Sequence, residues 1–193
     1  MGMHVHELHA AAIHAPLVLL PAAAVVDLSA AITGDRRGDA LGRKLWWLAV
    51  GAGALAGVAG LAASQEVKTD DHATEDMMWL HGAANFTILL GGVGVALYRT
   101  FKRPSLPEAL VGLGAVGLSF YTAYLGGEMV YGEGVGVRAV PEFAPNGIRR
   151  SPPVLSRSAP ATFLRDAVAG FSWLVRRTAV FVNKRHDLET LAH

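Results

Sequence analysis

Long runs of apolar residues alternate with short polar segments over the first two-thirds of the chain. The four runs cover Ala15–Thr33, Leu45–Ser64, Met77–Tyr98 and Ala109–Gly127. Only the first contains a charged residue, Asp27. Each run is close to the roughly 20 residues that a helix needs to cross a bilayer. Because soluble all-α cores rarely carry four such runs, the pattern predicts an all-α integral membrane protein with a four-transmembrane-helix bundle.

The pattern divides the chain into three parts. Residues 1–137 form the predicted transmembrane domain, with spans near residues 10–33, 45–64, 77–98 and 109–131. A Pro-rich linker follows at residues 138–162, and a basic amphipathic helix and tail at residues 163–193. In this C-terminal amphipathic helix, the apolar residues that share one face are Leu164, Val168, Phe171, Val175 and Val182. Its uncharged runs are too short to cross a bilayer, so we expect it to lie on the membrane or to dock on a partner.

Basic residues set the expected orientation. The loops after the first and third spans carry seven Lys and Arg residues, whereas the loop at residues 65–76 carries one lysine and five acids. The positive-inside rule places the seven-charge side in the cytoplasm. We therefore expect a multi-pass protein of the bacterial inner membrane, with both termini on the periplasmic side. Trp46 and Trp47 are expected at the inner interface and Trp79 at the outer interface.

Composition narrows the chemistry. The chain has no cysteine, which excludes disulfides, thiolate metal sites and thioether-attached haem. A formal net charge of +1 is too small for a nucleic-acid-binding domain, which is usually strongly basic. Nine Lys and Arg against four acids after residue 137 make the tail basic, so it could meet anionic lipid or other subunits of a membrane complex. Eight histidines remain as the main candidate ligands.

Three ionisable residues are predicted to lie at one depth near the periplasmic face. His14 and His81 each lie about one helical turn into a span, and Glu128 ends the fourth span on the same side. Two imidazoles from different helices are what a six-coordinate haem b requires. His14, His81 and Glu128, with His72 from the outer loop, could instead hold a divalent transition metal. Simple hydrogen bonding among these groups, with no cofactor, is the third possibility.

Four further residues could support such a site. His9 lies about 140° around a helix from His14, so the two are not expected to bind one iron together, although His9 could act from the second shell of ligands. Asn85 follows His81 by one helical turn and could orient its ring. Tyr124 shares a stripe with Glu128 and could line the site. Asp27, deep in the first span, is a candidate proton relay or a partner for a polar group on another helix.

Several motifs together resemble a known family. The segment HAAAIHAP covers residues 9–16, HGAAN covers residues 81–85, and GGEMVY covers residues 126–131. Over about residues 5–137 the chain is similar to the bacterial four-span membrane family catalogued as domain of unknown function 2231. That family usually has a histidine near the position of Glu133, so this chain departs from the pattern there. Some relatives are joined to Rieske iron–sulfur domains, and the resemblance therefore implies a redox setting.

These observations predict a membrane redox protein that holds a haem b near the periplasmic face and passes electrons within a larger complex. A periplasmic electron carrier is the expected partner, and no independent enzymatic activity is expected. Two alternatives stay open. One is an accessory subunit of a membrane complex with no cofactor, docked through its basic tail. The other is a membrane protein that binds a metal through His and Glu.

Overall fold

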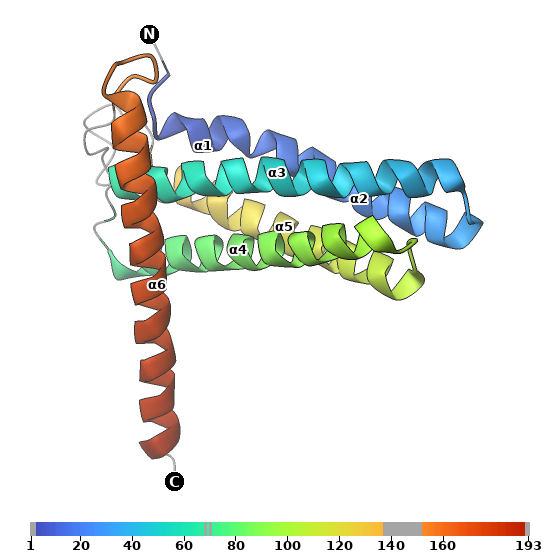
Figure 1. Cartoon of the computed structure of the whole chain (residues 1–193). Helices are drawn as coiled ribbons and strands as arrows, with labels where there is room; N and C mark the ends of the chain where they lie inside the picture. Colours follow the sequence, from blue (N-terminus) through green and yellow to red (C-terminus); the bar gives the residue numbers. More distant parts are fainter. Residues whose placement is uncertain (1–2, 68, 70, 137–151, 192–193) are drawn as a thin grey trace.

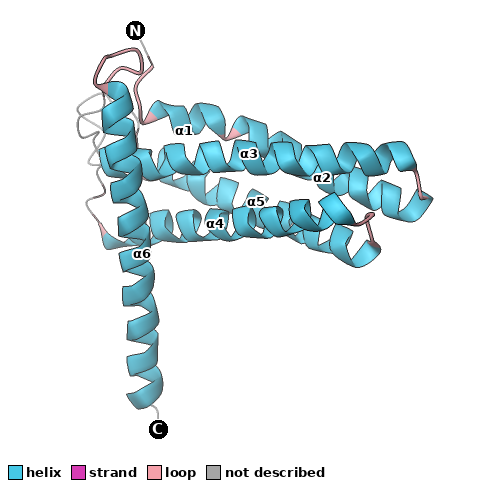
Figure 2. Ribbon diagram, viewed as in Figure 1, coloured by secondary structure: helices cyan, strands magenta, loops and turns pink. Residues whose placement is uncertain are grey.

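The computed structural model describes residues 3–67, 69, 71–136 and 152–191, with the side chains of the last helix up to residue 183. Within these residues the chain forms helices and no strand (Figures 1 and 2). The helices are α1 (Glu7–Ala12), α2 (His14–Thr33), α3 (Arg36–Glu66), α4 (His72–Phe101), α5 (Leu106–Tyr131) and α6 (Ala159–Leu191). Figure 1 shows α1 to α5 as an elongated bundle, with α6 crossing one end of it.

Four helical segments are long and apolar enough to cross a membrane, and α1 and α2 together form the first of them. The predicted all-α membrane fold with a C-terminal helix is therefore confirmed. The second segment has 31 residues and so a length of about 46 Å, which exceeds the roughly 30 Å hydrocarbon core of a bilayer. The ends of the spans thus extend into the headgroup regions, further than the apolar runs alone predict.

Neighbouring spans run antiparallel around the bundle. Both α2 and α4 pack against α3 and α5, so α2 and α4 lie diagonally opposite each other. We call the end where α3 stops and α4 begins the α6 end, because α6 lies there (Figure 1). The connections from α2 to α3 and from α4 to α5 lie at the opposite end.

Local sequence accounts for the ends of the spans. Gly34 ends α2 with φ at +70°, a left-handed conformation that glycine adopts without strain. Asp35 then caps α3 by accepting hydrogen bonds from two backbone amides, and Asp71 caps α4 by accepting from the backbone amide and the hydroxyl of Thr74. Hydrogen bonds from Thr74 hold the pKa of the Asp71 carboxyl below its usual value. Ser105 and Glu108 form a capping box at the start of α5.

The first span is interrupted at Ile13, between α1 and α2. Pro16 has no backbone N–H, so it cannot donate the usual helical hydrogen bond to the carbonyl of Ala12. Ile13 keeps helical angles, with φ at −62° and ψ at −23°. The helix therefore continues with a local irregularity, and α1 adds a turn and a half to the α6 end of the bundle.

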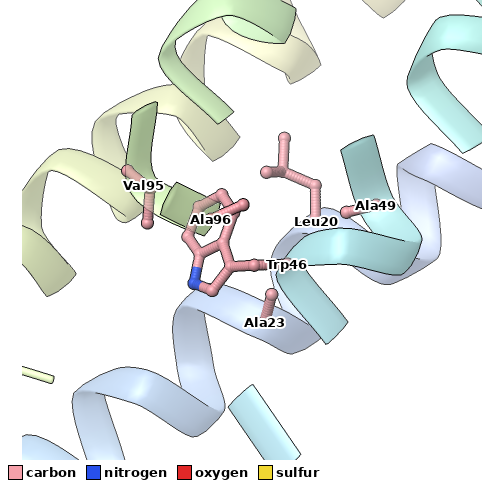
Figure 3. Packing of buried hydrophobic residues seen from close by; sticks show 6 residues of the cluster. All are labelled: Leu20, Ala23, Trp46, Ala49, Val95 and Ala96. Carbon is pink, nitrogen blue, oxygen red and sulfur yellow. The ribbon is translucent and has the colours of Figure 1, made fainter. Parts of the chain in front are cut away.

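Small residues bring the helices close together around one large side chain. Trp46 on α3 is fully buried, and Figure 3 shows it packed with Leu20, Ala23, Ala49, Val95 and Ala96. A Cβ atom on Gly112 of α5 would lie 3.0 Å from Trp46 Cζ2, so the indole packs directly on that helix. The expectation that Trp46 marks the inner interface is therefore wrong, because this tryptophan belongs to the core. Trp47 is partly exposed, as an interfacial residue should be.

The last helix begins at Ala159, earlier than the predicted start at residue 163. It packs across α3 and the first turns of α4, and Figure 1 shows it crossing the spans rather than running along them. The segment before α6 also contacts the start of the chain, because Val5 N–H donates to Pro152 O and Val154 N–H to Met3 O. Most of the predicted linker, at residues 138–151, lies outside the described residues.

Candidate functional site: a buried pair of histidines

Two histidine rings from opposite corners of the bundle meet near the α6 end. His9 lies on α1, at the start of the first span, and His81 lies on α4. The ring centroids are 6.2 Å apart and the ring planes are nearly perpendicular, at 89°. The two imidazoles therefore form an edge-to-face pair inside the bundle.

Both rings are held by backbone carbonyls of the other two helices. His9 Nδ1 lies 2.9 Å from Ala56 O on α3, and His81 Nδ1 lies 2.8 Å from Thr122 O on α5. A carbonyl oxygen only accepts, so Nδ1–H is the donor in both rings. Each neutral ring then keeps its lone pair on Nε2. Metal-ligating histidines commonly have this arrangement, in which a carbonyl holds one nitrogen and the other binds the metal.

Asn85 supports the His81 ring from one helical turn further along α4. Its Nδ2 donates to His81 O at 2.8 Å and, because Nε2 carries the lone pair, also to His81 Nε2 at 3.3 Å. Its Oδ1 accepts from Thr122 Oγ1 at 3.2 Å, so Asn85 links α4 to α5 beside the ring. The contact between Asn85 and His81 that their spacing predicts is present.

Glycines allow the rings to lie against the backbone of their neighbours. A Cβ atom on Gly60 of α3 would come within 2.9 Å of His9 Nδ1. A Cβ atom on Gly126 of α5 would come within 3.2 Å of His81 Cε1. The first distance is shorter than real Cβ contacts, so a larger residue at position 60 would push the His9 ring aside. Gly126 opens the GGEMVY motif, and its contact with His81 gives that glycine a packing role.

The other residues proposed from the sequence lie outside this cluster. His14 is exposed, and its Nδ1 is 3.3 Å from Ala11 O in its own helical turn. Glu128 and Tyr124 are exposed on α5, and the His72 side chain is 97% exposed beside Glu75. The structure therefore pairs His81 with His9 rather than with His14. The reason is rotational: α1 turns His9 into the bundle, which leaves His14 on the outside.

A three-ligand metal site does not form where it was expected. Within the described part of the chain, no three His, Asp or Glu side chains come together in a way that could hold a metal ion. His14, His72, His81 and Glu128 are therefore not assembled into one donor set. Imidazoles do meet in pairs: His9 with His81 inside the bundle, and His4 with His6 near the start of the chain, where the ring centroids are 6.1 Å apart.

Asp27 belongs to a separate buried cluster towards the opposite end of the bundle. Its Oδ2 accepts from Trp46 Nε1 at 2.7 Å and from Arg99 Nε at 2.8 Å. Its Oδ1 accepts from Arg99 Nη2 at 3.1 Å. Asp27 and Arg99 have no exposed surface. Of the two roles considered for Asp27, the arrangement matches an ion pair with a group on another helix.

Each of the three guanidinium nitrogens of Arg99 donates to an acceptor. Its Nη2 also donates to Asp39 Oδ1 at 2.8 Å and to Asp39 O at 3.0 Å, and its Nη1 donates to Lys102 O at 2.6 Å. A buried ion pair persists only when such hydrogen bonds complete it. Arg99 directly follows the apolar run Met77–Tyr98, so the sequence predicts it as one of the seven basic residues in the loops, because a charge next to an apolar run resembles the end of a span. The sequence feature that points to a buried cation is the intramembrane acid Asp27, which requires a cationic partner.

The model of one protein family, described as "Predicted membrane protein (DUF2231)", matches residues 5–139. The chain belongs to the DUF2231 family. No curated protein matches the chain. No solved structure matches it either.

Both buried clusters lie within the part of the chain that defines its DUF2231 membership. The matched residues include His9 and His81 at one end of the bundle and Asp27 and Arg99 towards the other. Helix α6 lies outside the match.

Proposed function

We propose that this DUF2231 protein is a membrane electron-transfer protein that binds one haem b between α1 and α4, with His9 and His81 as the axial ligands. The proposal keeps the redox function predicted from the sequence and replaces His14 with His9. The observation that carries it is that both rings donate through Nδ1 to a backbone carbonyl, so that both Nε2 atoms carry a lone pair. The lone pair of His81 accepts from Asn85 Nδ2 at 3.3 Å, a hydrogen bond that a bound iron would replace.

The number of donors favours haem over a bare metal ion. Zinc and related ions usually need three or four protein ligands, whereas haem iron needs two, because the porphyrin supplies the other four. Inside the bundle the described residues bring the imidazoles of His9 and His81 together, and no group of three His, Asp or Glu forms there. We therefore prefer a haem to the His/Glu metal site considered above.

The distance between the ring centroids matches one shared metal atom, and binding would turn the edge-to-face rings so that both Nε2 atoms face it. Two imidazoles that bind the same metal with bonds of about 2 Å have centroids roughly 6 Å apart. The centroids of His9 and His81 are 6.2 Å apart. Glycines beside both rings, Gly60 and Gly126, keep the adjacent backbone free of side chains. Spacing, tautomer and donor count thus support the same ligand pair.

A bound haem would supply one-electron chemistry, and the protein residues would set its position and environment. Ala56 O and Thr122 O would orient the ligands and make them more basic through their hydrogen bonds. Asn85 would hold the α4 backbone and α5 together next to His81.

The site lies near the α6 end, which we propose faces the periplasm of a bacterial inner membrane. In support, the opposite end carries six exposed basic residues, as the positive-inside rule expects of the cytoplasmic side. They are Arg36, Arg37, Arg43, Lys44, Lys102 and Arg103. We further propose that a periplasmic electron carrier and other subunits of a membrane complex are the partners, because electrons must enter and leave at the exposed end of the site.

An absorption spectrum of the full chain tests the proposal. The protein is purified in detergent after expression with a haem precursor, and it is measured oxidised and after reduction with dithionite. We expect sharp reduced α and Soret bands of a b-type haem. His9→Ala and His81→Ala should each lose most of these bands, whereas His14→Ala should keep them.

The His14→Ala variant is the matched control, since it removes an imidazole from the same span. Size-exclusion chromatography shows whether each variant keeps the fold. A featureless spectrum of the folded parent protein, before and after incubation with hemin, would overturn the proposal and leave a cofactor-free accessory subunit. Loss of the bands in His14→Ala but not in folded His9→Ala would restore the ligand pair predicted from the sequence.

A further inference from the structure

The contacts of α6 with α4 determine which face of α6 points in which direction. They occur at several positions along the length of α4. Arg177 donates to Glu75 Oε2 at 2.9 Å and to Asp76 Oδ1 at 2.7 Å, close to the first residue of α4. Leu174 packs where a Cβ atom on Gly82 would lie 3.4 Å from its Cδ1. Gly82 is seven residues beyond Glu75 and so about 10 Å further from the α6 end.

Contacts with α3 hold the middle of α6 in place. Gly170 crosses α3 so closely that a Cβ atom there would clash with Leu61 O. Asp166, Ala167 and Leu174 are buried on the same face. The face of α6 that carries these residues therefore lies against the helices of the bundle.

The direction of rotation determines where the remaining faces of α6 point. Arg177 and Leu174 lie about 60° apart around the axis of α6. Arg177 contacts the first turn of α4, whereas Leu174 contacts Gly82, further from the α6 end. A further turn of about 100° in the same sense reaches Val175. The face that carries Val175 therefore points along the spans, towards the middle of the membrane.

That face is apolar, and no part of the chain that the structure describes covers it. Its exposed side chains are Leu164 (64%), Val168 (67%), Phe171 (47%), Val175 (51%) and Val182 (58%). We call these five residues the apolar stripe. Arg165 and Arg176, one residue beyond members of the stripe, are exposed and turn about 100° away from it.

We propose that α6 lies in the interface of the membrane that the bundle spans, with the apolar stripe inserted into the lipid. Its depth supports lipid as the occupant: α6 crosses α3 at Leu61, about 8 Å before the end of that helix at Glu66. Interfacial helices bury their apolar face roughly 5–10 Å into the boundary between headgroups and acyl chains.

The neighbouring surface supports the same occupant. The exposed side chains of the spans are largely apolar, so the stripe continues a surface that already meets acyl chains. Arg165 and Arg176 point away from the apolar stripe, as charged residues of interfacial helices commonly do. This inference is independent of the haem proposal, since it uses only contacts between α6 and the bundle.

The absence of cysteine allows a direct test with single labels. Leu164→Cys and Val175→Cys place a fluorophore on the apolar stripe, and Arg165→Cys and Arg176→Cys are their sequence neighbours and matched controls. Each full-length protein is placed in nanodiscs and quenched by nitroxide on lipid acyl chains or by aqueous iodide. We expect lipid quenching to be several-fold stronger at the stripe positions, and iodide quenching several-fold stronger at the arginine positions.

Two results would overturn the inference. Stripe positions quenched by iodide rather than by lipid would place the stripe in water. Stripe positions shielded from both quenchers would mean that protein covers the stripe, either a second copy of the chain or another subunit. Monodisperse elution of each labelled protein checks that the fold is intact.

Discussion

A single arginine holds three parts of the bundle together away from the α6 end. Arg99 on α4 binds Asp27 on α2 and Asp39 on α3, and its side chain has no exposed surface. Each charge taken out of water costs several kcal/mol, which a complete set of partners can offset. Asp27 also needs room: a Cβ atom on Gly42 of α3 would clash with its Oδ1. The cluster therefore depends on one glycine as well as on its charges.

Removing one charge of the cluster should destabilise the protein strongly. Arg99→Met leaves Asp27 buried without its cation, which costs about 3–5 kcal/mol when one partner of a buried pair is lost. We expect a large drop in the midpoint of thermal unfolding, measured in detergent. Adding Asp27→Asn to this variant should recover part of the loss, because the uncompensated charge is then gone.

Arg103→Met is the control for this experiment. Arg103 also approaches Asp39, at 3.7 Å, but its side chain is 63% exposed. Surface ion pairs contribute little to stability, so the midpoint should hardly change. A similar loss in Arg99→Met and Arg103→Met would mean that the buried position of Arg99 does not matter.

At this scale, the sequence identified the right kind of residue more readily than the right individual. Imidazoles near one end of the spans were expected, and two do meet there. His14 was favoured over His9 because its depth in the apolar run was known and the rotation of the helix was not. That rotation depends on small residues of other helices, such as Ala56 and Gly60, which receive the His9 ring. A single sequence does not show which helices are neighbours.

Among the elements, α6 depends most on one close contact. Its crossing with α3 at Gly170 leaves no room for a side chain, because a Cβ atom there would meet Leu61 O. The remaining contacts use larger groups, including the pair of Trp79 and Phe181 with ring centroids 4.9 Å apart. Trp79, expected at the outer interface, is thus one of the α4 residues on which α6 packs.

A larger residue at position 170 should release α6 from the bundle. We expect Gly170→Val to weaken docking by more than 1 kcal/mol and to speed tryptic cleavage within α6 by roughly tenfold. Limited proteolysis of the protein in nanodiscs measures the rate.

Gly114→Val provides a comparison, since a Cβ atom on Gly114 of α5 would have no atom within 4 Å. Its cleavage should proceed at the parent rate. Unchanged cleavage in Gly170→Val would show that α6 is held without this crossing.

Element boundaries were predictable where hydropathy decides them and not elsewhere. The four apolar runs all lie inside spans of the structure. The spans are longer than the runs, since α3 begins at Arg36 and α4 at His72, in polar segments that caps make helical. The two possibilities for the amphipathic helix, membrane or partner, could not be separated from sequence, because its rotation depends on contacts with α4.

For the whole molecule, the charges at the two ends predict its orientation. Exposed basic residues gather at the end opposite α6, so that end should face the cytoplasm. Lys102→Cys and His72→Cys place single thiols at the two ends, and both side chains are exposed. A membrane-impermeant maleimide should label His72→Cys in intact cells and Lys102→Cys only after the membrane is opened. The reverse pattern would invert the orientation and place the histidine pair near the cytoplasm.

The pairing of Asp27 with Arg99 also affects how the chain is made. The two residues are 72 positions apart, so Asp27 leaves the ribosome well before its partner exists. During that interval the first span carries an acid for which a bilayer offers no counter-ion. We expect the insertion machinery to retain this span until α4 arrives. The bundle would then be completed in one late step of biogenesis, when the guanidinium of Arg99 enters the membrane and pairs with the carboxylate of Asp27.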